Sequence, residues 1–324
     1  MSLRVGLIGT GYAARLRAEA LQKDDRGYLV AVVGHTLDKT QVFSQTYSAE
    51  ALQSWAELVE RSDVDLVMIA NVNRDHGAIA RAALQAGKHT VVEYPLSLDI
   101  AEAETIIQLA EMQQKLLHVE HIELLSGIHQ AIKTALPAIG TPFYVRYSSL
   151  KPERPAPQKW TYDLDLFGFP LVGAVSRVHR LINLFGKVAT VSCRARFWGR
   201  MAPSNAYTAC LCTAQLEFSS GLIAEVIYGK GDAIWQPSRS LDIHGEQGAI
   251  LIDGEQGTLV KPDQQFPLSM GTRHGLFVKD TTMVLDHLTT GTALYVSTDA
   301  SLYALRVADA IRQSAVTGQT IRLR

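Results

Sequence analysis

The first third of the chain alternates short, almost continuously apolar runs with segments whose apolar residues recur at helical spacing. Such apolar runs are typical of strands buried on both faces, and their alternation with helices is typical of a parallel, doubly wound sheet. The pattern therefore predicts an N-terminal α/β domain. The expected strands are 3–8, 28–34, 65–70, 89–93 and 116–121, and the expected helices are 13–22, 37–46, 76–86 and 99–114.

After about residue 122 the rhythm changes to a long series of strands with few helices. This order predicts a second α/β domain built on a large, mainly antiparallel open sheet. We expect domains at 1–122 and 123–324, with the last helix free to pack back on the first. The expected helices are 123–136, 171–185, 281–289 and 299–315, and the expected strands are 143–149, 190–198, 206–218, 222–229, 239–244 and 249–253.

The composition is that of an ordinary globular protein, with 47% hydrophobic and 19% charged residues. A formal net charge of −1 provides no basic field for nucleic acid or an anionic membrane. No apolar run reaches the roughly 20 residues that span a bilayer. Because strand-like sequence follows Met1 almost at once, we expect no signal peptide and a cytoplasmic protein.

The three cysteines fit that compartment. Cys210 and Cys212 flank one residue in an alternating stretch, so a strand would place both on one face of a sheet. Their spacing lacks the two intervening residues typical of metal or redox pairs. We therefore expect buried free thiols, Cys193 included.

A glycine motif lies between the first expected strand and helix. Gly9 would permit a tight turn, Gly11 would let a pyrophosphate approach the backbone, and Ala14 would let the helix pack on the strand. Against a purely structural glycine turn, the position at a strand–helix junction favours dinucleotide binding. The expected cofactor contacts here are Gly9, Thr10, Gly11, Tyr12, Ala13 and Ala14.

The second expected strand ends in Gly34, His35 and Thr36, which we expect to face the adenine ribose. NAD-preferring sites usually carry an Asp or Glu here, whereas the first acid of this chain is Asp38, in the next helix. Small neutral residues with Lys39 nearby favour NADPH. NADH is the weaker alternative.

These features combine with Asn71-Val72-Asn73, His76, Gly87-Lys88-His89 and a Glu93-x-Pro95 turn. Together they resemble the superfamily of glucose-fructose oxidoreductase and inositol dehydrogenase, over the whole chain. The resemblance implies a Rossmann domain followed by a substrate domain. It also implies cofactor contacts on the nicotinamide or ribose side from Asn71, Val72, Asn73, His76 and Glu93.

The catalytic residues of the sugar and polyol enzymes are not found at the matching positions. Those enzymes carry a Lys where this chain has Tyr94, and an Asp and a His about four residues apart on the helix lining the cleft. Counting back from Leu184-Phe185-Gly186 places Val172 and Ser176 there. The Glu-Tyr-Pro turn instead resembles the biliverdin reductase branch, and 116–125, 156–162 and 224–231 are similar to its cyanobacterial members.

That resemblance implies NADPH-dependent reduction of biliverdin IXα to bilirubin, with hydride transfer to the C10 methine and protonation of a nitrogen. It also implies Arg177 as the residue closest to the chemistry. Because its pKa exceeds 12, arginine is a poor proton donor, and we expect an electrostatic role. Tyr94 is expected to form a flat wall beside the pigment. A surface arginine and a packing tyrosine are the alternatives.

Further pigment contacts are expected from cleft-lining Glu120 and His121, from His179 and Arg180, and from Trp160 in a Pro-rich loop. Simple packing is the alternative for His179 and Arg180. A metal site around His118 is not expected, because alternate residues of a strand point to opposite faces. A sugar or polyol dehydrogenase and a non-catalytic NADP-binding regulator remain competing functions. Both a monomer and a homodimer are compatible with the sequence.

Overall fold

The computed structural model of the protein describes residues 2–200, 204–272 and 274–323. Contacts along the chain divide it into two compact units, Met1–Leu125 with Gly275–Leu302, and Ser126–His274 with Tyr303–Arg324. The first unit thus includes the late segment Gly275–Leu302, which lies in the second of the two predicted domains. Among the described residues, no helix has both the length and the apolarity needed to cross a membrane.

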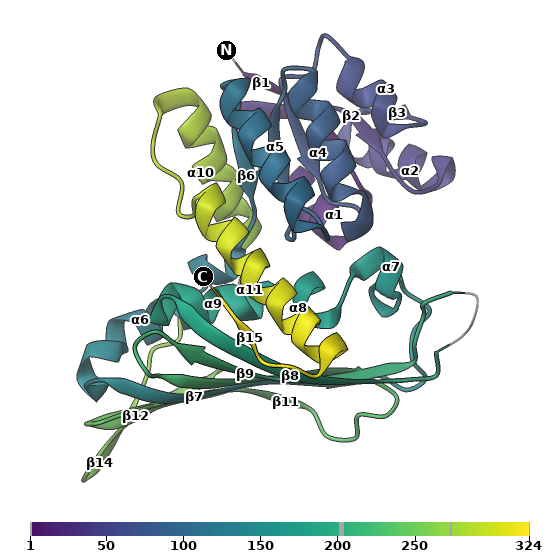
Figure 1. Cartoon of the computed structure of the whole chain (residues 1–324). Coiled ribbons are helices and arrows are strands. Elements are labelled where there is room, and N and C mark those ends of the chain that lie inside the picture. The colour runs from purple at the N-terminus through teal and green to yellow at the C-terminus, as the bar shows by residue number, and fades with distance from the viewer. Residues whose placement is uncertain (1, 201–203, 273, 324) are drawn as a thin grey trace. The chain divides into compact units, whose positions relative to one another are not determined.

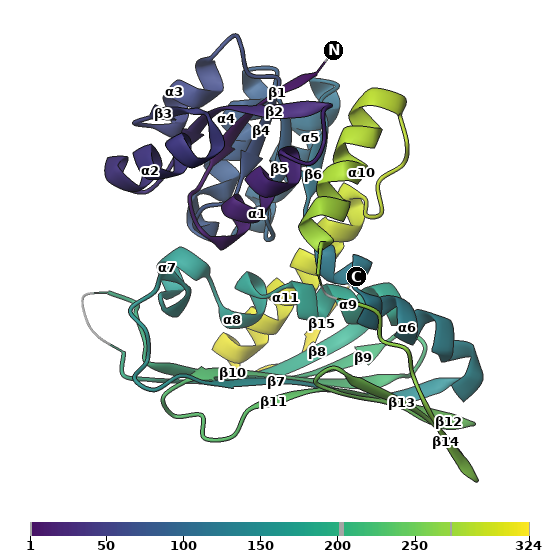
Figure 2. The same ribbon diagram turned by 180° about the vertical axis from the view of Figure 1, so that it is seen from behind.

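The described part of the first unit holds a six-stranded parallel sheet in the order β3-β2-β1-β4-β5-β6. Its central strands β1 and β4 are rich in buried aliphatic side chains, as the continuous apolar runs predicted. Helix α1 packs with α10, and α4 packs with α5 (Figures 1 and 2). The predicted doubly wound sheet is confirmed. The strands are β1 (Leu3–Ile8), β2 (Gly27–Val33), β3 (Glu50–Leu52), β4 (Leu66–Ile69), β5 (His89–Val92) and β6 (Leu117–Val119).

The helices of this unit lie close to the predicted ranges, with one addition. Strand β3 and helix α3 were not predicted, because elements of three and six residues are too short to show a period. Asp99 is the N-cap of α5 and accepts the N–H of Glu102 at 2.8 Å. The Glu102 carboxylate accepts from Ser97 and Arg81. The helices are α1 (Tyr12–Leu21), α2 (Leu37–Tyr47), α3 (Trp55–Glu60), α4 (His76–Gln85), α5 (Ile100–Met112) and α10 (Leu276–Thr290).

The described part of the second unit is built on a nine-stranded sheet in the order β14-β13-β12-β11-β7-β10-β9-β8-β15. The pair β7–β10 is parallel and the other neighbours are antiparallel, which confirms the predicted mainly antiparallel sheet. The short strands β13, β14 and β15 were not predicted. The strands are β7 (Pro142–Pro152), β8 (Val188–Trp198), β9 (Ala209–Phe218), β10 (Ile223–Gly231), β11 (Ser238–Gly245), β12 (Gly248–Asp253), β13 (Gln256–Lys261), β14 (Gln264–Pro267) and β15 (Ile321–Arg322).

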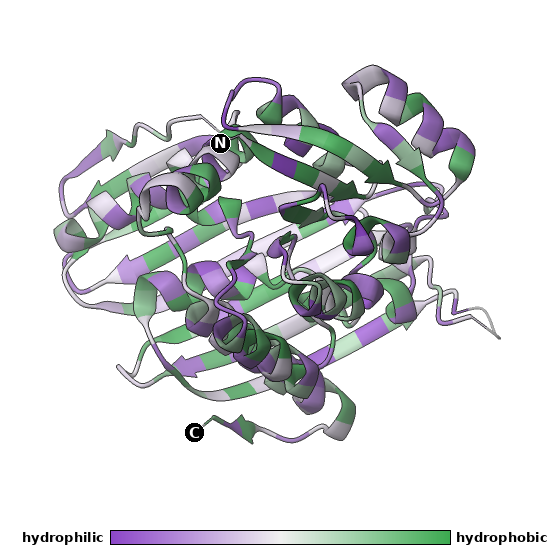
Figure 3. Cartoon of the chain, turned by 90° about the horizontal axis from the view of Figure 1, so that it is seen from above, coloured by the Kyte–Doolittle hydropathy of each residue, from purple (hydrophilic) through white to green (hydrophobic). Residues whose placement is uncertain are grey.

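Alternating hydrophobic and polar positions fix which face of this sheet is buried (Figure 3). Along β9, Cys210 and Cys212 are buried while Thr213 and Gln215 are exposed, so both cysteines share the core face as predicted. All three cysteines are free and buried. The core also includes side chains from the helices of this unit, among them the second half of α11. These helices are α6 (Gly127–Ala135), α7 (Leu164–Phe167), α8 (Pro170–Gly173), α9 (Ser176–Phe185) and α11 (Thr298–Thr317).

Two predicted helices of this unit have different bounds. The helix expected over 171–185 is broken at Ala174, which has φ −110° and ψ 36°, so Val172 and Ser176 lie on the separate helices α8 and α9. Here Gly173 packs so closely on the chain that a Cβ would lie 2.5 Å from the Phe167 carbonyl oxygen. The helix expected from residue 123 begins only at Gly127, after a 3₁₀ turn, with Ser126 as its N-cap.

Candidate functional site

The glycine turn between β1 and α1 has the geometry of a phosphate-binding loop. Gly9 has φ +127°, and a Cβ there would lie 2.3 Å from the Ala70 carbonyl oxygen, so a side chain is excluded. Gly11 is the N-cap of α1, and a Cβ there would meet nothing within 4 Å. Ala14 is buried against the core. The open space at the helix N-terminus, with backbone donors facing it, fits a pyrophosphate.

A substitution at Gly11 is therefore expected to change cofactor binding without changing folding. Its φ of −83° and ψ of −164° are extended, so valine is tolerated by the backbone. We expect Gly11→Val to keep the wild-type melting temperature but to weaken NADPH binding by about 10²-fold, because the branched side chain fills the space of the phosphate. Fluorescence titration with NADPH measures the loss. Wild-type affinity in the folded variant would contradict the assignment of this turn.

The end of β2 provides a neutral, open environment. The Gly34 N–H donates to Thr40 Oγ1 at 2.9 Å, and Thr36 precedes α2 as its N-cap. His35 and Thr36 are exposed, and Asp38 lies in the first turn of α2. The three residues that follow β2 include no acid that would bind a ribose 2′-hydroxyl. This segment therefore fits a cofactor with a 2′-phosphate.

The residues after β4 support the neighbouring turn. Asn73 and His76 are buried, while Asn71 and Val72 are half-buried. His76 Nδ1 lies 2.8 Å from the Pro95 carbonyl oxygen, and burial lowers the pKa of its imidazole. The structure therefore places His76 as a neutral support of the Glu93–Pro95 turn.

Tyr94 follows β5 at the carboxyl end of the parallel sheet, the edge where such sheets bind ligands. Its peptide bond to Pro95 is cis. The half-buried Tyr94 ring stacks on the ring of His121, with centroids 5.6 Å apart and planes at 6°. The two rings thus form a parallel, stacked aromatic pair after β5 and β6.

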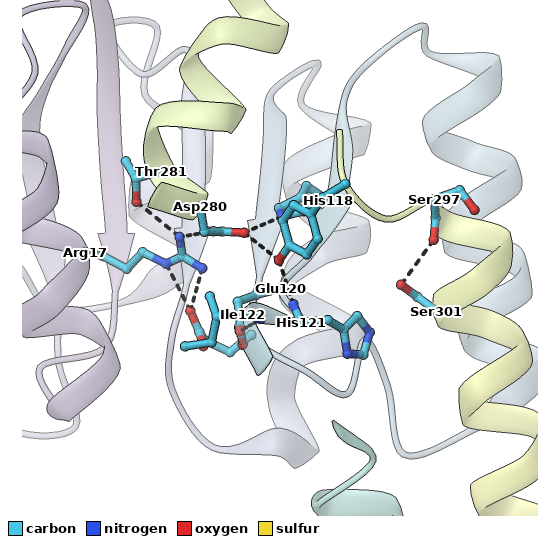
Figure 4. A network of polar contacts seen from close by, with 11 residues as sticks. Arg17, His118, Glu120, His121, Ile122, Asp280, Thr281, Ser297 and Ser301 are labelled. Atoms are coloured by element: carbon cyan, nitrogen blue, oxygen red, sulfur yellow. Dashed lines mark hydrogen bonds and ion pairs between the residues drawn. The ribbon is translucent and has the colours of Figure 1, made fainter. Parts of the chain in front are cut away.

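A buried polar network lies behind this turn (Figure 4). Arg17 of α1 donates to Glu93 at 3.0 Å, to Thr281 at 3.1 Å and to Asp280 of α10. Asp280 also accepts from His118 at 2.8 Å and from the Tyr295 hydroxyl at 2.7 Å. Burial opposes the charge of Asp280, but Arg17 and His118 prevail and hold the pKa of its carboxyl well below the usual range.

Glu120 belongs to this network. Strand β6 ends at Val119, so Glu120 and His121 lie beyond the regular alternation that the sequence predicted. Both are buried, and a Glu120 oxygen accepts the N–H of Ile122. Burial, together with Glu93 and Asp280, raises the pKa of Glu120 well above its ordinary value. Its surroundings therefore favour the protonated form of the Glu120 carboxyl.

Sequence reasoning missed four members of the network, Arg17, Asp280, Thr281 and Tyr295, and considered His118 only as a possible metal ligand. A signal existed for two of them. Arg17 lies among Ala14, Ala18 and Leu21 on the buried face of α1, and Asp280 occupies the buried face of α10. A charged residue at a core position of a helix needs a buried partner.

In the second unit, α9 carries Arg177, His179 and Arg180. Arg177 is half-buried, with its guanidinium carbon 5.0 Å from the centre of the Tyr228 ring. His179 and Arg180 are buried, and Arg180 donates to the Tyr147 hydroxyl at 3.2 Å. Burial, with His129 nearby, lowers the pKa of His179 to about 4, so its imidazole is neutral at pH 7.

Trp160 lies on a 3₁₀ turn in the loop after β7. It is exposed, and its ring centre lies 5.7 Å from that of Phe167. Phe167 also contacts the buried Lys230, whose ammonium lies 4.5 Å from the Phe167 ring and donates to the Thr161 carbonyl. The exposed indole thus lies on a segment that Lys230 anchors through the Thr161 carbonyl.

Both halves of the chain match profiles of one oxidoreductase family, known by the initials GFO/IDH/MocA. Residues 3–121 match its NAD-binding Rossmann fold, and residues 137–323 match its C-terminal alpha/beta domain. The chain belongs to this family of oxidoreductases.

Among solved structures, the chain is similar to biliverdin reductase from Synechocystis sp. PCC 6803, crystallised with biliverdin and NADP⁺. The two share 50% sequence identity with a TM-score of 0.95, over 97% of this chain and 99% of that one. Mouse biliverdin reductase A is 25% identical over 88% of this chain and 85% of its own length. Human biliverdin reductase A is 32% identical over 43% of this chain and 44% of its own length.

Proposed function

We propose that the protein reduces biliverdin IXα to bilirubin with NADPH. The observation that carries this proposal is the similarity, at 50% identity and over nearly the whole of both chains, to a reductase crystallised with biliverdin and NADP⁺. The Glu93-Tyr94-Pro95 turn agrees with it, because the flat pair of Tyr94 and His121 suits a planar pigment. A sugar or polyol dehydrogenase would need a cation at position 94.

The residues around the glycine turn hold the cofactor. The N–H groups at the start of α1 bind the pyrophosphate at Gly9–Ala14, and Gly34–Thr36 receive the ribose phosphate. Asn71, Val72, Asn73 and Glu93 border the nicotinamide side, with His76 fixing the turn from behind. Bound NADPH supplies the hydride. NADH serves as a weaker donor.

Arg177 and Tyr94 act on the pigment. C10 of a conjugated tetrapyrrole is already electrophilic, so the protein has to orient the pigment and control its charge. Arg177 is permanently cationic and stabilises the pigment electrostatically at a lactam oxygen or a propionate. Tyr94 forms a wall beside the pigment. We also propose pigment contacts for Glu120, His121, His179, Arg180 and Trp160.

A direct assay tests this function. The purified protein is mixed with NADPH and biliverdin, and we expect the green pigment to turn yellow as NADPH absorbance falls. The same protein is tested with NADP⁺ and a panel of polyols, where we expect no NADPH to form. NADP⁺-dependent polyol oxidation without biliverdin reduction would overturn the proposal. NADPH binding without turnover of either substrate would indicate a regulator.

We further propose a cytoplasmic location and a monomer or homodimer. Three buried free thiols agree with a reducing compartment. Fractionation of the native cells and light scattering of the purified protein decide these two points.

A further inference from the structure

The described part of the buried network holds more carboxyl groups than one cation can neutralise. Arg17 donates to the carboxyls of Glu93 and Asp280. Glu120 lies in the same cluster as Arg17 and Asp280 (Figure 4). Asp280 and Glu120 are buried, so a second unbalanced negative charge would be costly there. The cluster is therefore expected to retain a proton.

Hydrogen bonding indicates where that proton resides. Asp280 accepts from Arg17, His118 and Tyr295, which is the pattern of an ionised carboxylate. Glu120 faces Glu93, and their side chains share a hydrogen bond. Carboxylates only accept, so two of them are hydrogen-bonded only when one carries a proton. The proton thus lies between Glu93 and Glu120.

We propose that Glu93 and Glu120 share one proton and that this pair donates the proton gained by the pigment nitrogen, an inference that rests on the proposed function. Glu120 is 1% exposed and forms the buried end of the pair. The Glu93 side chain is 14% exposed, directly precedes Tyr94 and forms the outer end. The pair therefore links a buried carboxyl, which holds the proton, to a partly exposed carboxyl, from which the proton can leave.

The proton step balances with the proposed reaction. The O–H bond of the pair breaks at Glu93 after the proton has passed from Glu120, and an N–H bond forms on the pigment. The hydride comes from NADPH, and the pair, left doubly ionised, regains a proton from solvent. Arg17 makes this donation feasible, because its guanidinium stabilises the additional negative charge.

The surroundings of the pair set its proton affinity. Arg17 faces it from α1 and Asp280 from α10, while His118 and Tyr295 bind Asp280 from the other side. His76 supports the same turn through the Pro95 carbonyl, and burial lowers the pKa of its imidazole, which favours its neutral form. Burial first, then Glu93 and Asp280, raises the pKa of the Glu120 carboxyl, which favours its protonated form, and the proton is lost as the pH rises through this raised pKa.

Infrared spectroscopy of the whole protein without pigment tests for the stored proton. Exposed carboxyls are ionised at pH 7, so a protonated carboxyl band reports a buried acid. We expect this band in the wild type, its loss in Glu120→Gln and its retention in Glu111→Gln, which changes an exposed glutamate of α5. Glutamine preserves the shape, because its NH₂ can donate to Glu93 and its oxygen can accept from Ile122. A band unchanged by Glu120→Gln would overturn the shared proton.

Kinetics test the donor role. We expect Glu120→Gln to lower kcat by about 10²-fold at pH 7, as loss of a general acid does, with an unchanged KM for NADPH. The wild-type kcat should fall as the pH rises through the pKa of the pair, and the variant should lack this decline. Glu111→Gln should match the wild type throughout. A wild-type kcat and pH profile in Glu120→Gln would overturn the donor role.

The two readouts keep this inference distinct from the proposed function. If the wild type shows the infrared band but does not reduce biliverdin, the proposed function and the donor role fail together, whereas the shared proton stands. If the wild type reduces biliverdin and Glu120→Gln does so equally well, the proposed function stands and the donor role fails.

Discussion

Replacing Arg177 with alanine is expected to lower kcat for biliverdin reduction by about 10²- to 10³-fold, the usual effect of removing a group that stabilises charge in the transition state. The side chain is half-buried and contacts the face of Tyr228. Only about 0.5–1 kcal/mol of folding stability is expected to be lost with that contact. The KM for NADPH should remain close to wild type.

One further variant separates charge from geometry at this position, and a second variant is a control. Arg177→Lys keeps the charge but loses the planar fork, so we expect it to recover only part of the rate. Arg194→Ala removes an exposed arginine of β8 in the same unit and should leave kcat unchanged. Stopped-flow measurement of NADPH oxidation at saturating pigment gives the rates. A normal kcat in Arg177→Ala would remove this residue from the mechanism.

The fold was predictable where elements are long and their pattern is regular. The strand at Leu3–Ile8 was predicted with its exact bounds, because a continuous apolar run between a polar start and a glycine turn has few other interpretations. The break between α8 and α9 was not predictable, because it depends on the close packing of Gly173 against Phe167. Helical spacing alone carries no information about such a tertiary contact.

The candidate site also has a part that could be predicted from the sequence and a part that could not. The glycine motif and the Glu93-Tyr94-Pro95 turn are contiguous, so their local geometry follows from the sequence. The network behind them joins Asp280 to His118 and to Arg17 across 162 and 263 residues of chain. The sequence showed that Arg17 and Asp280 are charges on apolar helix faces, but a single sequence cannot pair them. Only the fold brings α1, β6 and α10 to one place.

That long-range pairing leads to the largest expected effect on stability. Asp280→Ala removes one of the two carboxylates that the Arg17 guanidinium binds, and that guanidinium is only 1% exposed. His118 and Tyr295 lose the same acceptor. Breaking a buried pair in this way costs about 3–5 kcal/mol. The control is Glu19→Ala, which removes the half-buried partner of the exposed Arg15 in an i,i+4 pair and should cost no more than about 0.5 kcal/mol. Urea denaturation measures both free energies of unfolding.

The pH dependence of the same pair gives an independent check. The Asp280 pKa is lowered in the folded protein, so the stability it contributes is present above the ordinary value of about 3.9 and is lost as the pH falls through the folded value. The difference in free energy of unfolding between the wild type and Asp280→Ala should therefore be constant from pH 6 to 8 and shrink below about pH 4. A difference that is small at pH 7, or that does not shrink in acid, would show that Asp280 is not held as a carboxylate by Arg17.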